Sequence, residues 1–499
     1  MDVFGLRNQI VGDYADYIRS FIQIDDSRIS AHVDAELRNG LLWPQPLLQL
    51  NPSFEPGAWI DDLVQQGQLH AECRSIFRIK EPDKPDKPLR LHRHQDEALA
   101  AARSGDSYIV TTGTGSGKSL GYIIPIVNYV LRAGSGQGIR AIVVYPMNAL
   151  ANSQFFELEK FLCRGYPEGS PPVTFRRYTG QESDEEREEI LAKPPDILLT
   201  NYVMLELLLT RPHEKKIVAA AHGKLQFLVL DELHTYRGRQ GADVALLVRR
   251  VRDSCANPRL QCVGTSATMA GGGAFSEQQR QIAGVASRLF GVTVKPERVI
   301  GETLRRVTAE RDLILPTEQA ALRRRVQDQL TPPPATFAAF CTDPLASWIE
   351  STFGLATEAA SGRLKRATPN SISGPDGAAA SLAQTIDVDE GLCRTAIERT
   401  LLAGYDVLHP ETGFPVFAFR LHQFISRGDT VYASLEANDK RHITTQAQQF
   451  VPNDRTRVLL PLAFCRECGQ EYYSVFRHFD RATASTTYLP RQLTEQVGE

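Results

Sequence analysis

Tyr108-Ile-Val-Thr-Thr-Gly-Thr-Gly-Ser-Gly-Lys-Ser119 is the stretch that decides the fold. A short run of β-formers leads into three alternating glycines, and an apolar-periodic segment follows at residues 120–131. This order predicts a strand, a glycine loop and a helix, in which loop amides and the positive end of the helix dipole surround a phosphate. We expect Lys118 to reach the outer phosphates and the Ser119 hydroxyl to ligate Mg²⁺.

The loop contributes the predicted nucleotide-binding residues through backbone amides and short polar side chains. They are Thr112, Gly113, Thr114, Gly115, Ser116, Gly117, Lys118 and Ser119. The strict phosphate-loop pattern has glycine at position 112, so the match is incomplete. The alternative is a glycine-rich loop without function, which the Gly-Lys-Ser sequence and the flanking strand and helix disfavour.

Composition sets limits on the class of protein. The chain has 499 residues, is 23% charged and has a net charge of −3, so it lacks an overall basic signature of nucleic-acid binding. A local basic groove is still compatible with this charge. The start lacks a signal-peptide pattern and no apolar run approaches the length of a membrane span, so we expect a cytoplasmic protein without membrane contact. The eight scattered cysteines do not form a disulfide framework.

Strand and helix patterns alternate after the loop. Apolar strands are predicted at residues 139–145, 227–230 and 260–263, with helices at 148–162 and 241–251. This rhythm predicts a parallel sheet with right-handed crossovers, whose ligands bind at the carboxyl ends of the strands. The glycine loop, the acidic pair and the Ser-Ala-Thr segment each follow a strand, so we expect them to share one crevice.

Asp231-Glu232 follows the buried run of residues 227–230. An acid placed after such a strand is costly unless it serves a cation or another partner. We expect Asp231 to hold Mg²⁺, directly or through water, and Glu232 to deprotonate the water that attacks the γ-phosphate. A turn or helix cap is the alternative, but it accounts for the aspartate only.

Together these segments resemble superfamily 2 helicases. The glycine loop, Asp231-Glu-Leu-His234 and Ser266-Ala-Thr268 look like motifs I, II and III of that family. Gln95, in Leu91-His-Arg-His-Gln95, falls where the family has its adenine-reading glutamine, and an amide offers the required donor and acceptor. The family tolerates threonine at the position of Thr112. A finer likeness is to bacterial DEXH helicases of repair and phage defence that carry a cysteine-bearing C-terminal region.

The resemblance implies further roles, among them ATP and Mg²⁺ as cofactors and a nucleic acid as partner. We expect that nucleic acid to be DNA, although the sequence alone does not decide between DNA and RNA. The resemblance also implies that Ser266 and Thr268 couple the state of the bound nucleotide to how tightly the protein holds the nucleic-acid strand. The residues implied to contact the strand backbone come from motifs Ia, Ib and Ic, and they are Pro146, Asn148, Thr179, Gly180, Thr200 and Asn201.

The expected architecture is an α/β fold. It consists of a RecA-like P-loop domain with a parallel sheet flanked by helices, a helical N-terminal extension and a mixed α+β C-terminal region. The expected boundaries are an accessory region at 1–85, the ATP-binding domain at 86–305, an insertion or linker at 306–460 and the start of a zinc-ribbon-like region at 461–499. Within the insertion, residues 355–383 are rich in Ala, Ser and Gly and predict a flexible connection.

Cys465-Arg-Glu-Cys468 has the spacing of half a zinc site. A tetrahedral site needs about four ligands, and no second pair follows. His478 or His422 could complete it, although neither has a characteristic spacing. The alternative is a reduced pair of cysteines without metal.

A second motor domain is not evident. Residues 306–499 contain no Q-x-x-G-R-x-x-R segment, the arginine-bearing motif of the family. We therefore expect the front half of a longer helicase, with a second RecA-like domain or downstream polypeptide, and other repair or defence proteins, as partners. Two functions stay open: an ATP-dependent helicase or translocase, and a non-catalytic nucleotide-switched nucleic-acid-binding module. The Thr-Ser-Ala-Thr segment and motif Ia disfavour a GTPase or kinase.

Overall fold

The computed structural model describes the chain except for residues 1, 22, 81–83, 114, 168–169, 268–273, 360, 427–429, 481–484 and 491–499. The chain divides into two units. The sheet unit consists of Ser53–Arg305 and Thr357–Lys365. The mixed unit consists of Met1–Pro52, Arg306–Ala356 and Arg366–Glu499.

A seven-stranded parallel sheet forms the centre of the sheet unit. Its strands follow the order β13-β7-β12-β11-β8-β10-β9. Neighbouring strands of this sheet are parallel, so the chain must cross over the sheet between them, and helices make these crossovers. The predicted α/β architecture is therefore confirmed. The bounds are β13 (Val299–Gly301), β7 (Tyr108–Thr111), β12 (Gln261–Ser266), β11 (Phe227–Leu230), β8 (Ala141–Tyr145), β10 (Ile197–Asn201) and β9 (Phe175–Tyr178).

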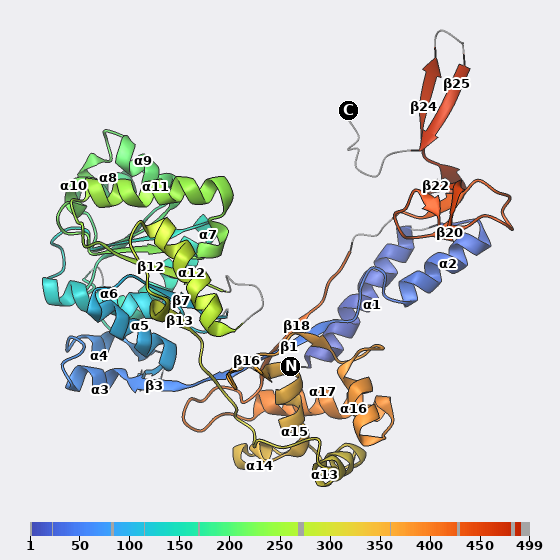
Figure 1. The fold of residues 1–499 in the computed structure, drawn as a ribbon, viewed down its shortest axis with the longest axis horizontal. Coiled ribbons are helices and arrows are strands. Elements are labelled where there is room, and N and C mark those ends of the chain that lie inside the picture. The colour runs from blue at the N-terminus through green and yellow to red at the C-terminus, as the bar shows by residue number, and fades with distance from the viewer. Residues whose placement is uncertain are drawn as a thin grey trace. The chain divides into compact units, whose positions relative to one another are not determined.

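Helices cover both faces of this sheet (Figure 1). In β8, Val143 belongs to one apolar core and Val144 to the other, because successive strand residues point to opposite faces. The first core takes in α3 (Ile60–Gln65), α4 (Cys73–Ile76), α5 (Arg93–Ser104), α6 (Leu120–Ala133) and α7 (Asn148–Leu162). The second takes in α8 (Asp184–Ala192), α9 (Tyr202–Thr210), α10 (Lys215–Ala221), α11 (Gly238–Ser254) and α12 (Phe275–Phe290). Two 3-10 turns, Leu233–Thr235 and Pro296–Arg298, complete the unit.

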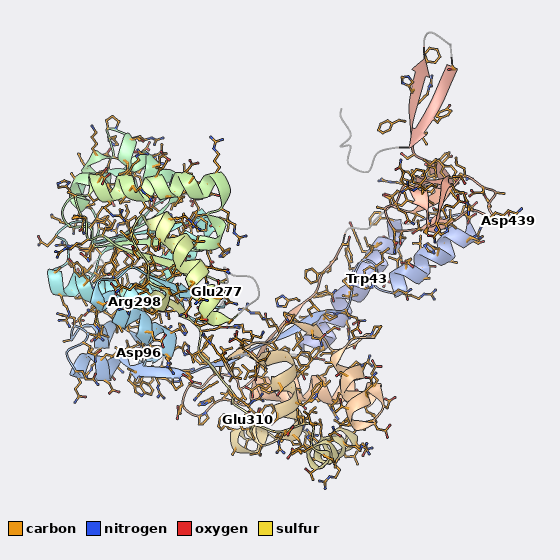
Figure 2. The ribbon with its side chains drawn as sticks, viewed as in Figure 1. Trp43, Asp96, Glu277, Arg298, Glu310 and Asp439 are labelled. Atoms are coloured by element: carbon orange, nitrogen blue, oxygen red, sulfur yellow. The ribbon has the colours of Figure 1, made fainter. Side chains whose placement is uncertain are left out.

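The segment before the glycine loop packs on the sheet unit, so the structural division lies near residue 52 and differs from the boundary expected at 85. Ile60, Leu63 and Phe77 are buried in the first core. The Asp96 carboxylate of α5 accepts a hydrogen bond from the Ala58 amide at 3.0 Å. Asp96 is labelled in Figure 2. Three short antiparallel pairs join this segment: β2 (Ser53–Phe54) with β14 (Leu304–Arg305), β3 (Pro56–Trp59) with β6 (Arg90–His92), and β4 (Arg78–Ile79) with β5 (Lys87–Pro88).

The mixed unit combines helices with small antiparallel sheets, as predicted for the extension and the C-terminal region. Its helices are α1 (Val3–Phe21), α2 (Ser27–Arg38), α13 (Pro316–Gln327), α14 (Phe337–Cys341), α15 (Pro344–Ile349), α16 (Ala378–Ile386) and α17 (Glu390–Asp406), with a π-helix at Glu350–Gly354. One sheet has the order β17-β1-β18, from β1 (Leu47–Asn51), β17 (Asn370–Ser371) and β18 (Ala418–His422). The other has the order β20-β19-β22-β21 with β23 on β22, from β19 (Tyr432–Ser434), β20 (Ile443–Thr444), β21 (Phe450–Val451), β22 (Asp454–Phe464) and β23 (Glu471–Tyr473).

The remaining strands lie at the edges of these parts. β24 (Val475–Asp480) and β25 (Ser485–Pro490) pair as an antiparallel hairpin. The short strands β15 (Leu355–Thr357) and β16 (Leu364–Arg366) lie where the chain passes between the two units. The longest helix in the described part of the chain, α1, has 19 residues, and no described helix is long and apolar enough to cross a membrane.

The prediction of a flexible connection at residues 355–383 was wrong. This stretch contains β15, β16, β17 and the first part of α16. Ala379, Leu382 and Ile386 recur at helical spacing and are fully buried against the other helices of the mixed unit. The Ala-rich composition therefore reflects close helix packing, because small side chains let helices approach.

Candidate functional site

The glycine loop lies between β7 and α6, as predicted. Gly115 and Gly117 have φ values of +80° and +69°, a region that L side chains rarely adopt. A Cβ at Gly117 would lie 2.6 Å from the Gln95 amide nitrogen. The loop therefore needs glycine at both positions, for its backbone turn and for close contact with Gln95.

Buried polar groups hold the loop in shape. The Thr112 and Ser116 hydroxyls are 2.5 Å apart. The His94 Nε2 lies 3.0 Å from the Ser116 carbonyl oxygen, which accepts its hydrogen bond. Burial lowers the pKa of His94 below its usual value, so the ring is neutral at pH 7 and its Nε2 carries the proton.

Gln95 lies beside the loop with both ends of its amide engaged. Its oxygen accepts from the His92 amide at 2.8 Å, and its nitrogen donates to the Gly117 carbonyl at 2.8 Å. The side chain helps cap the N-terminus of α5. Its predicted contact with adenine stays a prediction, and would require at least one of these bonds to be shared.

The acidic pair lies next to the loop, so the structure brings together the residues expected in one crevice. The Asp231 amide donates to the Val144 carbonyl at 2.9 Å, which continues the β11–β8 pairing. Lys118 Nζ is 3.3 Å from Glu232 Oε1, and His234 Nδ1 is 3.2 Å from Glu232 Oε2. Glu232 has a φ of +51°, a conformation that costs roughly 1–3 kcal/mol for a residue other than glycine and clusters at functional sites.

Asp231 is in an environment that disfavours its charge. Burial raises the pKa of this carboxyl above its ordinary value, and the Glu232 charge adds to the shift. A hydrogen bond from the Thr265 hydroxyl and the Lys118 charge act in the opposite direction. Burial together with the Asp231 charge also raises the pKa of the Tyr122 hydroxyl, so that group stays protonated. A cation beside Asp231 would relieve this cost, so the residues fit the predicted Mg²⁺ site, with Ser119 at the N-terminus of α6 as the second ligand.

The end of β12 connects to the acidic pair. Ser266 is fully buried, and its hydroxyl lies 3.2 Å from His234 Nδ1. The Thr265 hydroxyl also accepts from the Glu232 amide at 3.1 Å. The predicted coupling residue Ser266 therefore contacts the turn that carries the acids. Thr268 and Thr114 lie outside the described residues.

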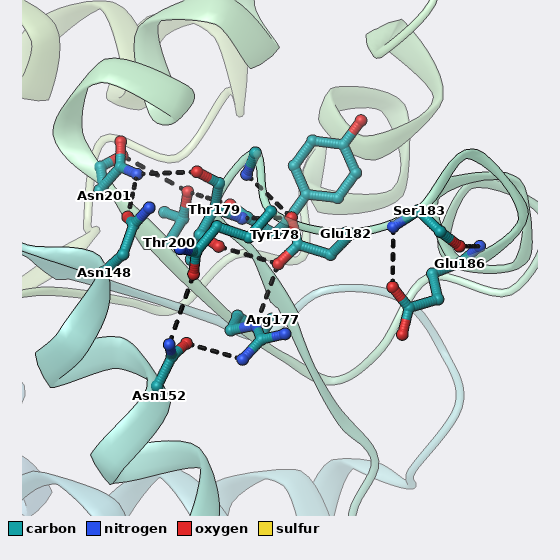
Figure 3. A network of polar contacts seen from close by, with 12 residues as sticks. Asn148, Asn152, Arg177, Tyr178, Thr179, Glu182, Ser183, Glu186, Thr200 and Asn201 are labelled. Carbon is teal, nitrogen blue, oxygen red and sulfur yellow. Dashed lines mark hydrogen bonds and ion pairs between the residues drawn. The ribbon is translucent and has the colours of Figure 1, made fainter.

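A second polar cluster joins the predicted nucleic-acid residues (Figure 3). The Asn201 amide nitrogen donates to Asn148 Oδ1 at 2.7 Å and to the Thr179 carbonyl at 3.0 Å. The Thr200 hydroxyl donates to the Tyr178 carbonyl at 2.7 Å. The cluster thus joins the carboxyl ends of β9 and β10 to the start of α7, and Pro146 lies just before it, between β8 and α7.

Glu182, which was not among the predicted residues, holds this second cluster together. It is 6% exposed, and it accepts from the amides of Thr179 and Gly180, each at 2.8 Å. Its other oxygen accepts from Arg177 Nε at 3.0 Å, and Arg177 also donates to Asn152 at 2.7 Å. Burial alone would raise the pKa of Glu182, but these hydrogen bonds lower it below its ordinary value. An acid two residues after a Thr-Gly turn is the local signal that could have identified it.

The predicted zinc site is not completed in the described part of the chain. The Cys465 carbonyl accepts from the Gly469 amide at 2.9 Å, and Gly469 has a φ of +77°. Hydrogen bonds from the backbone of Cys468 and Glu467 lower the pKa of the Cys465 thiol. His422 lies in β18 and His478 in β24. No group of three or more His, Cys, Asp or Glu side chains among the described residues could hold a metal ion.

The region around the loop is similar to known proteins. The family model for DEAD/DEAH box helicases matches residues 92–273. The chain is 25% identical over 393 residues to Druantia protein DruE of Escherichia coli, covering 55% of this chain and 21% of that protein. It is 33% identical over 192 residues to the uncharacterized ATP-dependent helicase YprA of Bacillus subtilis, covering 38% and 24%.

A solved structure, the DUF1998 helicase MrfA bound to DNA, has 21% sequence identity and a TM-score of 0.40, covering 59% of this chain and 37% of that one. The chain spans about a quarter or less of the length of the two curated relatives, DruE and YprA.

Replacing the half-buried Asp231 by asparagine should raise the melting temperature of the nucleotide-free chain. The carboxyl has a raised pKa in the folded state, so its charged form opposes folding at every pH above its unfolded pKa. A neutral amide removes that cost. Thermal unfolding at pH 7 measures the change, and Asp243→Asn, on the exposed side of α11, is the matched control. A lower melting temperature for Asp231→Asn alone would contradict the electrostatic account.

Glu182→Ala should destabilise the sheet unit, because it leaves the Thr179 and Gly180 amides and Arg177 without their acceptor. Unsatisfied buried donors cost about 1–3 kcal/mol each, so we expect a loss of roughly 2–4 kcal/mol in the free energy of unfolding. Denaturant titration followed by circular dichroism measures it, with exposed Glu189→Ala as the control. Equal stability of the two variants would show that Glu182 does not hold the cluster.

Proposed function

We propose that this chain, in which residues 92–273 form a DEAD/DEAH box helicase domain, supplies the first motor domain of an ATP-dependent helicase or translocase that moves on DNA. The observation that carries the proposal is the convergence of the phosphate-loop lysine with the acidic pair. Lys118 Nζ is 3.3 Å from Glu232, and Asp231 precedes that residue at the end of β11.

Each group at the proposed site would have its own task in hydrolysis. The loop amides and Lys118 hold the phosphates, and Ser119 and Asp231 would hold Mg²⁺. When bound, the ion neutralises charge on the phosphate oxygens. Glu232 orients the attacking water and accepts its proton.

Substrate binding would also prepare the base. Lys118 and His234 both contact Glu232. Phosphate oxygens would compete with Glu232 for Lys118, because a lysine forms charge-assisted hydrogen bonds to phosphate as well as to carboxylate. Glu232 then loses one cation and becomes free to accept a proton. This exchange ties activation of the base to arrival of the nucleotide.

The second polar cluster supports a role in gripping a nucleic-acid strand. Strand-backbone contacts use backbone amides and the side chains of Ser, Thr and Asn, and these are the groups that the cluster fixes in place. Asn148, Thr179 and Asn201 are joined by the hydrogen bonds shown in Figure 3. A strand of DNA along the carboxyl ends of β8, β9 and β10 is the proposed partner.

The alternative is a nucleotide-switched module that binds ATP and a strand but needs a partner for turnover. An arginine supplied by a second domain changes phosphoryl-transfer rates by about 10³ to 10⁵ in related chemistry. Residues 306–499 lack the arginine motif noted above. The intact Asp231 and Glu232 favour hydrolysis in the assembled system.

Nucleotide binding should depend on Lys118. We expect the chain to bind a fluorescent ATP analogue with Mg²⁺, and Lys118→Ala to weaken binding roughly a hundredfold, because charge-assisted hydrogen bonds contribute about 1.5–3 kcal/mol each. Fluorescence anisotropy gives the dissociation constants. Lys160→Ala, on the exposed face of α7, is the control and should bind like wild type. Unchanged affinity in Lys118→Ala would refute the assignment of the phosphate loop.

Turnover distinguishes the motor from the switched module. We expect slow ATP hydrolysis by residues 1–499 with single-stranded DNA, and acceleration when a second motor domain is supplied. Glu232→Gln should retain nucleotide affinity and lose the residual hydrolysis. Fast, DNA-stimulated hydrolysis by the chain alone would contradict its dependence on a second domain, and hydrolysis that survives Glu232→Gln would exclude this residue as the base.

A further inference from the structure

We propose that Glu302 and Arg363 position the phosphate loop, so that nucleotide affinity depends on a short segment far beyond the helicase domain in sequence. Both residues belong to the sheet unit, since Thr357–Lys365 packs there. The inference rests on the proposed function, because it names what holds the same loop in place. Neither residue contacts a predicted reacting atom, so both are positioning residues.

The first contact joins Glu302 to the loop. β13 ends at Gly301, which pairs with Thr111 at the end of β7. Glu302 follows directly, and its Oε2 accepts a hydrogen bond from the Gly113 amide at 3.1 Å. Gly113 is the first glycine of the phosphate loop. The edge strand of the sheet thus fixes the point where the loop leaves β7.

The second contact joins Arg363 to Glu302. Arg363 Nη2 donates to the Glu302 carbonyl at 2.5 Å, and its guanidinium carbon lies 3.5 Å from the centre of the Phe275 ring. A guanidinium over an aromatic face is attracted to the ring electrons. A Cβ at Gly301 would lie 2.6 Å from Phe275 and 3.0 Å from Arg363, so glycine at this position leaves space for both groups.

Two backbone hydrogen bonds fix Arg363 relative to Glu358. The Glu358 amide donates to the Arg363 carbonyl at 2.8 Å, and the Gly362 amide donates to the Glu358 carbonyl at 2.9 Å. Burial lowers the pKa of the guanidinium, and the nearby Glu358, Glu302 and Glu97 carboxylates oppose that shift. An arginine stays charged at neutral pH despite such a shift.

Arg363 also contacts α12 through Phe275. Phe275 begins α12, the helix that comes after the β12 end carrying Ser266. The side-chain nitrogen (Nε2) of Gln279 in α12 donates to the Val299 carbonyl of β13 at 2.9 Å, so the helix and the edge strand are fixed to each other. Arg363 therefore contacts both Glu302, which follows β13, and Phe275 of α12. A conformational change in residues 357–365 would be passed to the phosphate loop through the hydrogen bond between Glu302 and the Gly113 amide.

The experiment compares Mg²⁺-dependent binding of a fluorescent ATP analogue by wild type, Arg363→Ala, Glu302→Ala and the double variant. We expect each single change to weaken binding roughly tenfold, the effect of about one hydrogen bond to a charged group. The double variant should lose no more than either single, since both act through one chain of contacts. Lys365→Ala, an exposed cation on the same segment, is the control and should match wild type.

Conservative variants separate positioning from general destabilisation. Glu302→Gln keeps an acceptor for the Gly113 amide and should bind like wild type. Arg363→Lys keeps the charge over Phe275 but loses the planar fork, so it should be intermediate and serves also if Arg363→Ala does not fold. Melting temperatures of all variants are measured in parallel.

Four outcomes would overturn the inference. One is affinity within twofold of wild type for Arg363→Ala and Glu302→Ala while Lys118→Ala loses binding, which would leave the proposed function standing. A second is a loss of nucleotide affinity in the double variant that equals the sum of the two single losses. A third is an equal loss of affinity in Glu302→Gln and Glu302→Ala. Failure of wild type to bind the nucleotide would overturn the proposed function and this inference with it.

Discussion

The parallel pairing of β7, β12 and β11 is the constraint on which the candidate site depends. The Thr112 amide donates to the Ser266 carbonyl at 3.2 Å, and the Asp231 amide donates to the Val144 carbonyl at 2.9 Å. These bonds align the strand ends, so the glycine loop, the acidic pair and Ser266 meet at one edge of the sheet. A shift in register would separate Lys118 from Glu232, because each residue of a strand advances about 3.3 Å.

Buried or half-buried carboxylates occur at each functional part of the sheet unit, and each has different partners. Asp231 accepts a hydrogen bond from Thr265 and is stabilised by the nearby Lys118 charge, but its raised pKa indicates that these do not fully offset its burial. Glu182 has a full set of donors and a lowered pKa, which suits a structural role. Glu302 accepts from the loop itself. The incompletely compensated acid is the one expected to meet a cation, which follows from the cost of burying an unpaired charge.

The sequence was sufficient for the parts that depend on local pattern. The loop between β7 and α6, the acids at the end of β11 and the alternating strands and helices all follow from residues close together in the chain. The contacts that hold these parts join residues far apart. Gly113 and Glu302 are 189 positions apart, and Arg363 reaches the sheet from outside the matched region. No local pattern identifies such pairs. Composition alone likewise predicts a connection where the Ala-rich stretch leads into α16, because composition does not show which face of a helix is buried.

Titration calorimetry with a non-hydrolysable ATP analogue tests most directly whether the loop and the acidic pair bind Mg-ATP. The account predicts one nucleotide bound per chain, with affinity that falls when Mg²⁺ is removed by a chelator. Protection of residues 112–119 and 231–235 from hydrogen exchange in the same complex would place the nucleotide at the loop and the acids. Absence of binding heat, or binding that leaves both segments unprotected, would contradict the account.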